Sequence, residues 1–409
     1  MSNLKQFVLG AVACFAVFAS KGQTIQKVTS KNQLLGSRNV ITTAVPFLTI
    51  SPDARSAGMA DCGVATFADV NSMHFNPAKY AFVEKNGGLG VSYTPWLRQL
   101  VPDVSLSYIS LYGKIDKMSA AALTMRYFSL GSIQFTDDFG ASLGDQKPNE
   151  FAIDGAYSRK LSDNFSMGVA LRFIYSNLVP NLPSIGASTV KAGVSGAGDI
   201  SAYYKDNTKI SGMKTTYAFG ANIQNMGAKI SYTNSQNKDF IPTTLRLGAS
   251  GNMELDQYNM LMLTAEFTKL LVPTLPSYFS NISGSDSIGP DGKKPIQFGK
   301  DANVGVVKGM YQSFYDAPGG FKEEMREYNW SLGAEYWYDK QFALRTGFFH
   351  EPMTKGNRKY FTFGAGLRYN VFGLDFTYLV PIGQQHPLQN TLRFSLVFDF
   401  DAFGKEREY

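Results

Sequence analysis

The sequence predicts an all-β fold, a transmembrane antiparallel β-barrel of about 14 strands with an N-terminal hatch or plug segment. Apolar and polar residues alternate in many short runs, and no mature segment contains the roughly 18 to 20 consecutive apolar residues of a spanning helix. The 409 residues include 39 glycines, 22 tyrosines and 31 phenylalanines. Glycines that relieve crowding and aromatic girdles are typical of such barrels.

The last strand-like run, residues 391–400, shows the alternation most clearly. One face carries Leu392, Phe394, Leu396, Phe398 and Phe400, and the other carries Thr391, Arg393, Ser395 and Asp399. Neighbouring side chains point to opposite faces of a strand. The mean hydropathy is only −0.14, so the chain lacks enough other apolar surface to cover these faces, and we expect them to meet lipid.

The N-terminus predicts a signal peptide over residues 1–22. Lys5 precedes the apolar run Phe7–Phe18, and small residues stand three and one positions before the expected cut. Cys14 lies within that apolar run, which argues against a lipoprotein cut there. Removal of the signal leaves Cys62 as the only cysteine, which favours a small buried residue over a reactive thiol.

Fourteen candidate strands follow, an even number that suits a barrel with both ends in the periplasm. They cover Gly87–Leu97, Pro102–Lys114, Met118–Phe128, Glu150–Lys160, Asn164–Asn177, Gly198–Lys205, Thr215–Met226, Pro242–Met253, Tyr258–Lys269, Tyr328–Trp337, Lys340–His350, Lys359–Tyr369, Phe372–Pro381 and Asn390–Phe400. The barrel thus spans residues 87–400, and residues 401–409 form a periplasmic tail. Short turns alternate with long links, which we expect on the outer side, and the largest is 270–327.

Charged residues fall on the faces expected to point inward, because Arg or Lys at the bilayer midplane costs about 2 to 4 kcal/mol. These residues are Arg126, Asp154, Arg172, Arg246, Glu266, Glu335, Arg345, Arg368, Asp375, Arg393 and Asp399. They could line a lumen that conducts solutes. Because both signs occur in comparable number, the favoured interpretation is a ladder of paired charges that packs against a plug.

Residues 23–86 precede the barrel and lack its aromatic alternation. They are rich in small and turn-forming residues, which permit close approach to a wall, and we expect them inside or beneath the barrel. Within them Asn76-Pro77-Ala78 predicts a rigid turn that fixes the hatch where it enters the first strand.

These features resemble the FadL-type outer-membrane family, in which an N-terminal hatch plugs a barrel. More narrowly, PDARSAGMADCGVAT (residues 52–66) and DVNSMHFNPAKYAF (residues 69–82) resemble the PorV (LptO) family of the type IX secretion system of Bacteroidota. The resemblance implies a carrier rather than an enzyme. Such a carrier receives the C-terminal signal domain of secreted proteins at an SprA/Sov-like translocon and passes them to a surface attachment complex with a PorU-like sortase.

The longest loop offers the natural surface for cargo, since a loop of this length is uncommon unless it is functional or disordered. Its aromatic residues could anchor an interface, namely Tyr278, Phe279, Tyr311, Phe314 and Tyr315. The alternative is an irregular lid packed over the barrel mouth.

Two other functions remain open from the sequence. A FadL-like transporter of a hydrophobic small molecule would need an apolar path through the wall, and an outer-membrane lipid A deacylase would need a nucleophile. The three histidines lack the spacing of a zinc site, and no G-x-S-x-G elbow, Walker loop, dinucleotide fingerprint or C-x-x-C pair is present, so no cofactor is expected. The net charge of +6 is scattered, which favours contact with acidic outer-membrane lipid or lipopolysaccharide over nucleic acid.

Overall fold

The computed structural model describes residues 31–96, 103–136, 139–180, 184–185, 188–233, 238–279, 294–383 and 391–400. The predicted signal peptide (1–22) and C-terminal tail (401–409) lie outside these residues. Within them, no helix has the length and apolar character needed to cross a membrane.

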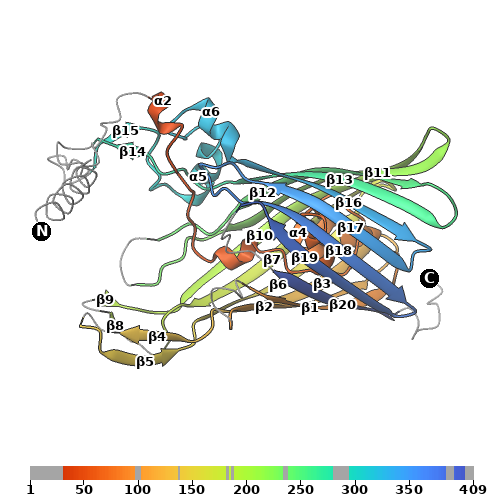
Figure 1. Ribbon diagram of the computed structural model, residues 1–409, viewed down its shortest axis with the longest axis horizontal. Helices are drawn as coiled ribbons and strands as arrows, with labels where there is room; N and C mark the ends of the chain where they lie inside the picture. Colours follow the sequence, from red (N-terminus) through yellow and green to blue (C-terminus); the bar gives the residue numbers. More distant parts are fainter. Residues whose placement is uncertain are drawn as a thin grey trace, which may run out of the picture.

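Fourteen antiparallel strands of the described chain form a closed barrel, which confirms the predicted barrel (Figure 1). They are β1 (Gly87–Pro95), β2 (Ser105–Lys114), β3 (Ser119–Ser129), β6 (Asn149–Lys160), β7 (Phe165–Asn177), β10 (Gly193–Ile210), β11 (Met213–Gly227), β12 (Thr244–Glu254), β13 (Asn259–Leu270), β16 (Tyr328–Tyr338), β17 (Phe342–His350), β18 (Lys359–Tyr369), β19 (Phe372–Pro381) and β20 (Leu392–Asp399). Each strand pairs with the next one along the barrel, and β1 closes the ring on β20.

The two faces of the strands differ as the alternation requires. In β20, Phe394 and Leu396 are 42% and 46% exposed, whereas the intervening Arg393 and Ser395 are buried. The outward apolar side chains form the lipid-facing surface, because an outer-membrane barrel needs an apolar band around its circumference.

The predicted bounds Gly198–Lys205 were too short for β10, which runs from Gly193 to Ile210. With β11 it forms a long hairpin that ends in the turn Ser211-Gly212, where both residues have positive φ. The added ends are polar or glycine-rich, so they lack the apolar alternation that marks a strand crossing lipid.

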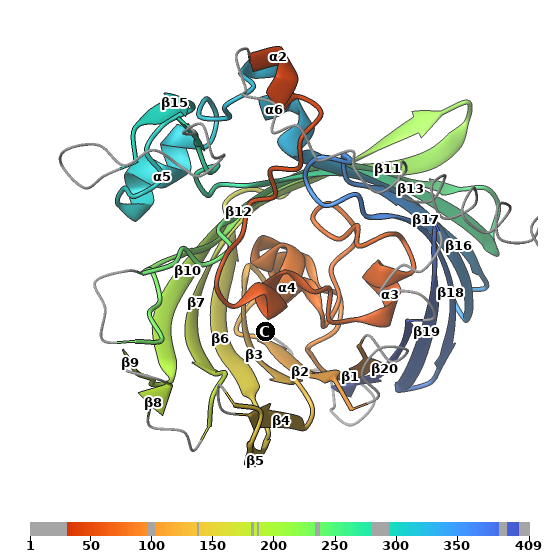
Figure 2. The same cartoon turned by 60° about the vertical axis from the view of Figure 1, so that its left-hand side comes forward.

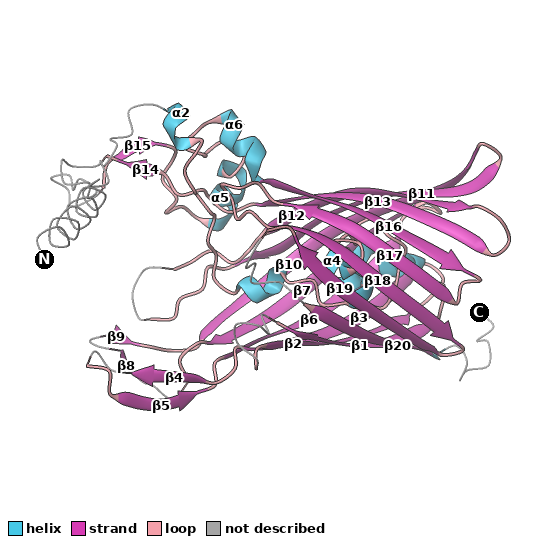
Figure 3. Cartoon of the chain, viewed as in Figure 1, coloured by secondary structure: helices cyan, strands magenta, loops and turns pink. Residues whose placement is uncertain are grey.

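Further small elements, which the sequence did not indicate, lie in the outer loops and in the segment that precedes the lumen (Figure 3). They are α2 (Lys31–Leu34), β4 (Ile133–Thr136), β5 (Ser142–Gln146), β8 (Ser184–Ile185), β9 (Ser188–Thr189), β14 (Ser277–Tyr278), β15 (Ile296–Phe298), α5 (Val306–Gln312), α6 (Phe321–Glu324) and the 3-10 turn η3 (Met325–Glu327). The hairpins β4–β5, β8–β9 and β14–β15 extend the loops away from the membrane-crossing strands. The part of loop 270–327 that is described is therefore a folded subdomain.

Residues 45–83, which we call the inner segment, lie inside the barrel (Figure 2). They contain η1 (Pro46–Thr49), α3 (Ala54–Ala57), α4 (Ser72–Phe75) and η2 (Pro77–Phe82), and most of them are buried. Before the inner segment, the Asn39 N–H donates to the Thr354 carbonyl at the long-loop end (2.9 Å). After it, Asn86 accepts from Lys114 N–H at the short-turn end (2.8 Å), so the chain crosses the whole lumen.

Apolar contacts hold the inner segment near both ends of the barrel. Toward the long-loop end, Phe47 and Leu48 pack in a buried cluster with wall residues such as Leu106 and Ile174. Toward the short-turn end, Met73 and Tyr80 belong to a second cluster with wall residues of β2, β3 and β7. These clusters are the core of the molecule, since the outward faces of the strands are apolar but exposed.

Candidate functional site

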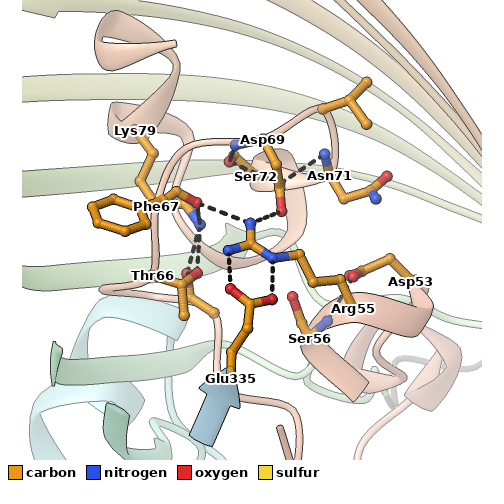
Figure 4. A network of polar contacts seen from close by, with 12 residues as sticks. Asp53, Arg55, Ser56, Thr66, Phe67, Asp69, Asn71, Ser72, Lys79 and Glu335 are labelled. Carbon is orange, nitrogen blue, oxygen red and sulfur yellow. Dashed lines mark hydrogen bonds and ion pairs between the residues drawn. The ribbon is translucent and has the colours of Figure 1, made fainter. Parts of the chain in front are cut away.

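The inner segment is joined to the wall by buried ion pairs, and Arg55 of α3 makes the most extensive set (Figure 4). Its Nε and Nη2 atoms donate to both carboxylate oxygens of Glu335 on β16, at 2.9 and 2.8 Å. Its Nη1 atom donates to Asp69 at 2.7 Å. A bidentate arginine–carboxylate pair fixes geometry as well as charge, so this contact sets the position of α3 against the wall.

This network of ion pairs continues along the barrel wall. Arg345 donates to Glu335 at 2.6 Å and to Asp375 at 2.8 Å. Asp375 also accepts from Arg368 at 2.7 Å. The signs alternate, so each buried charge has a partner of opposite sign and the cost of removing it from water is offset.

A second cluster lies on β6, β7 and β10, centred on Arg172. Its guanidinium donates to Asp154, to both oxygens of Asp199 (3.1 and 3.2 Å) and to the side-chain oxygen of Asn225. Arg126 approaches Asp154 at 3.9 Å, where it completes the charge balance of the cluster.

Two further pairs tie inner-segment backbone and side chains to the wall. Glu266 accepts from Arg246 at 2.7 Å and from the N–H groups of Gly63 and Val64, at 2.8 and 3.0 Å. In the other pair, Arg393 donates to Asp61 at 3.0 Å. The lumen is therefore lined by charges that already have partners.

The structure places the predicted inward charges on the lumen side of their strands. All are buried except Arg368 and Asp399, which are partly exposed beside a cavity of about 570 Å³ near the short-turn end. The prediction missed the partners supplied by the inner segment, among them Arg55, Asp61 and Asp69. The sequence did indicate that such partners are needed, because charged residues in a segment expected to be buried require partners of opposite sign.

The turn Asn76-Pro77-Ala78 opens η2 inside the barrel. The Asn76 side chain accepts from Ala78 N–H at 3.0 Å and donates to the carbonyls of Val64 (2.8 Å) and Ala202 (3.0 Å). It thus links two parts of the inner segment to β10. That the turn fixes a hatch remains a prediction.

Glycines in the wall allow the inner segment to approach closely. A Cβ atom on Gly220 of β11 would lie 2.0 Å from the Val64 carbonyl oxygen, and one on Gly347 of β17 would lie 2.5 Å from Ala60 N. Both neighbours are backbone atoms, which cannot move aside as a flexible side chain can. These two positions therefore require glycine.

The loop subdomain is anchored to the barrel rim by a second set of buried ion pairs, outside the lumen. Glu327 accepts from Lys269 at 2.5 Å and from Lys355 at 2.9 Å. Lys355 also donates to Glu323 at 2.7 Å. Because Lys269 lies near the end of β13 and Lys355 follows β17, these pairs fix the subdomain to two separate parts of the rim.

The aromatic residues predicted for partner binding lie on this subdomain. Tyr311, Phe314 and Tyr315 are 71%, 43% and 46% exposed, and the rings of Tyr311 and Tyr315 are 5.4 Å apart. Phe279 is 44% exposed and follows β14, and Tyr278 within that strand is partly buried. We call Tyr311, Phe314 and Tyr315 the aromatic patch. That these residues bind a partner remains a prediction.

Ser250 and His350, whose side chains are of the types used in hydrolysis, make structural contacts. The Ser250 hydroxyl donates to the Ala65 carbonyl at 2.7 Å, and the His350 ring stacks on Trp330 with centroids 5.0 Å apart. Among the described residues, no group of three or more His, Cys, Asp or Glu side chains is placed to hold a metal ion.

Comparisons with solved structures find outer-membrane barrels of low sequence identity. A Pseudomonas aeruginosa FadL homologue shares 12% identity with a TM-score of 0.42, and the match covers 89% of this chain and 100% of that one. The Pseudomonas putida toluene transporter TodX shares 9% identity with a TM-score of 0.47, covering 88% and 98%. No curated protein sequence matches the chain.

A family model gives the more specific result. The model described as type IX secretion system protein PorV matches residues 33–277, which is more than half of the chain. The matched range contains the inner segment, with both sequence blocks that carry the resemblance, and the barrel strands from β1 to β13. The chain, an outer-membrane β-barrel, therefore belongs to the PorV family of type IX secretion system proteins.

Proposed function

We propose that this protein is a shuttle of the type IX secretion system. It binds the C-terminal signal domain of secreted proteins at the translocon and delivers them to the surface attachment complex with its sortase-like peptidase. Membership in the PorV family supports a role in type IX secretion. The aromatic patch supports binding of a protein partner. Exposed aromatic side chains on a rigid support are typical anchors of protein interfaces.

The single observation that carries the proposal is the way the aromatic patch is supported. The subdomain that bears it is fixed to the rim by the buried Lys269–Glu327 and Lys355–Glu327 pairs, so its exposed rings are held in place before any partner arrives. A preordered surface loses less conformational entropy on binding than a mobile loop. The lumen, in contrast, is occupied by paired charges and offers cargo no comparable surface.

The test replaces the aromatic patch by Tyr311→Ser, Phe314→Ser and Tyr315→Ser in one variant. We expect normal insertion of the barrel, with secreted proteins retained in the periplasm or released without attachment, measured by fractionation of whole cells. Phe139→Ser is the matched control, since Phe139 is a 97% exposed aromatic residue on another outer loop. Wild-type secretion by the triple variant would overturn the role of this patch.

A hollow in the barrel wall favours one alternative, transport of a hydrophobic small molecule. It has a volume of about 540 Å³ and is lined by Leu171, Phe173, Gly196 and Met226 on β7, β10 and β11. Gly196 leaves no side chain on the outward face, so the hollow opens to the surrounding lipid. Uptake that persists in the aromatic-patch variant, together with normal secretion, would favour this alternative.

A further inference from the structure

Residues 40–43, with the sequence Val-Ile-Thr-Thr, cross the outer mouth of the barrel before the chain turns into the lumen. The segment is held at both ends, because Asn39 N–H donates to the Thr354 carbonyl and Ala44 N–H donates to the Phe240 carbonyl, each at 2.9 Å. All four residues are β-branched, a property that favours extended backbone. They belong to no helix or strand, and Figure 2 shows the chain between α2 and the inner segment as a loop.

Between these two anchors the backbone has no partner strand. No backbone hydrogen bond joins residues 40–43 to another residue in the part of the chain that the structure describes. None of the four has a positive φ, and the first residue that does is Val45 (φ 47°), where the chain bends into the lumen. The segment therefore offers unpaired backbone N–H and C=O groups, as an open strand edge does.

The direction of the free N–H groups follows from the anchors. In an extended chain, successive N–H groups point to opposite sides. Asn39 N–H points to the loop of residues 351–358, so the N–H groups of Ile41 and Thr43 point to the same side. The N–H group of Thr42 points to the other side, with that of Ala44.

A pocket of about 390 Å³ lies beside this edge. The segment forms one wall, and the opposite wall includes Leu270, Asn329, Glu351 and Arg358. The charged groups of that wall are already matched, since Arg358 pairs with Glu351 at 2.8 Å and Lys355 pairs with Glu327 at 2.9 Å. The pocket thus offers unused backbone groups rather than unused charge.

We propose that an extended, uncharged peptide segment adds to residues 40–43 as a neighbouring strand. Its backbone carbonyls accept from Ile41 and Thr43 N–H, and alternate side chains enter the pocket, as in recognition by strand addition. This inference rests on the proposed function, because it takes the peptide from the C-terminal signal domain of a secreted protein. It assigns that domain a second contact, separate from the aromatic patch.

Proline substitutions test the proposal with a control built into the chain. Ile41→Pro and Thr43→Pro each remove an N–H group that faces the pocket, whereas Thr42→Pro removes one that faces away. Proline and the residue before it accept extended backbone, so all three variants keep the local conformation. Each must also show the heat-dependent gel mobility of the wild type.

The measurement is binding of a purified signal domain to the detergent-solubilised full chain. We expect about tenfold weaker binding for Ile41→Pro and for Thr43→Pro, and a change of less than about twofold for Thr42→Pro. Hydrogen exchange supplies a second readout, because the amides of Ile41 and Thr43 should become protected when the domain binds, and that of Thr42 should not.

Each outcome has a defined meaning. Unchanged binding in all three variants, or equal loss in all three, would overturn strand addition while leaving the shuttle intact. Failure of the wild type to bind any signal domain would overturn the proposed function and this inference with it. Binding of a detergent or lipid in the pocket that competes with the domain but leaves the proline variants equal would assign the pocket to an amphiphile instead.

Discussion

At the scale of single residues, the buried arginines determine how the inner segment and the wall fit together. Arg172 balances Asp154 and Asp199, and all three side chains are buried. Removal of one member of such a group leaves uncompensated charge away from water, which is more harmful than loss of an exposed pair. The opposite case is the pair Lys214–Glu254, whose side chains are 60% and 41% exposed.

The difference in burial between these two groups predicts a difference in their contribution to stability. Arg172→Ala should lower the free energy of unfolding of the barrel by about 3 to 5 kcal/mol. Lys214→Ala should lower it by less than about 1 kcal/mol. Denaturant titration of the protein reconstituted in lipid vesicles, followed by tryptophan fluorescence, measures both. Equal effects of the two substitutions would contradict the importance of burial.

The contacts of Arg172 also show which features of a single residue the sequence predicts and which it does not. The inward direction of the Arg172 side chain follows from the alternation of side chains in β7, which the sequence itself predicts. Its contact with Asn225 does not, because β11 lies two strands along the barrel and Asn225 itself has positive φ. Pairing partners depend on strand register, which alternation leaves open.

At the scale of elements, close approach between inner segment and wall depends on glycine. Gly220→Ala places a Cβ atom against the Val64 backbone, so we expect the inner segment to shift and the barrel to lose about 1 to 3 kcal/mol of stability. Gly251→Ala on the adjacent strand β12 is the control, because its Cβ atom meets open space. The temperature of the gel mobility shift measures the difference, and equal temperatures would contradict it.

The loop subdomain should respond to pH through Asp316. Burial, together with the nearby charges of Glu324 and Glu327, raises the pKa of Asp316 from 3.8 to about 7. A raised pKa means that the folded subdomain binds the proton more tightly than the unfolded chain. Its contribution to stability is therefore complete below about pH 4 and is lost as the pH rises through about 7.

The expected result is weaker attachment of residues 294–327 at pH 8 than at pH 5. Proteolysis of intact cells measures it, with cleavage in the loop increasing between these values. Asp316→Asn carries no titratable proton, so its cleavage should change much less with pH. If wild type and variant show the same pH dependence, another group is responsible.

Sequence reasoning succeeded for the strands and failed for this subdomain for the same physical reason. A strand that crosses lipid shows its position by local alternation, as β20 does. The subdomain is stabilised by Lys269 and Lys355, which lie far from Glu327 in the sequence, so no local pattern marks it. The ends of β10 were missed because they are polar or glycine-rich, so they show no clear alternation of apolar and polar residues.

At the scale of the whole molecule, we predict that the inner segment closes the barrel to ions. The segment crosses the lumen, and the wall charges around it are paired. The intact protein should show little conductance in a planar bilayer, and a variant lacking residues 23–86 should show much more. Phe139→Ser, a substitution at a 97% exposed residue of an outer loop, should conduct like the intact protein. Porin-like currents from the intact chain would contradict this prediction.

The path of the inner segment also constrains the order of assembly. At one end it continues into residues bonded to the outer loops, as in the Asn39–Thr354 contact, and at the other end it leads directly into β1. If the segment entered a finished ring, its contacts with the outer loops and the wall would all have to form afterwards. We therefore expect the sheet to curl around the segment during insertion, so that the pairing of β1 with β20, from Gly88–Asp399 to Tyr93–Phe394, closes last.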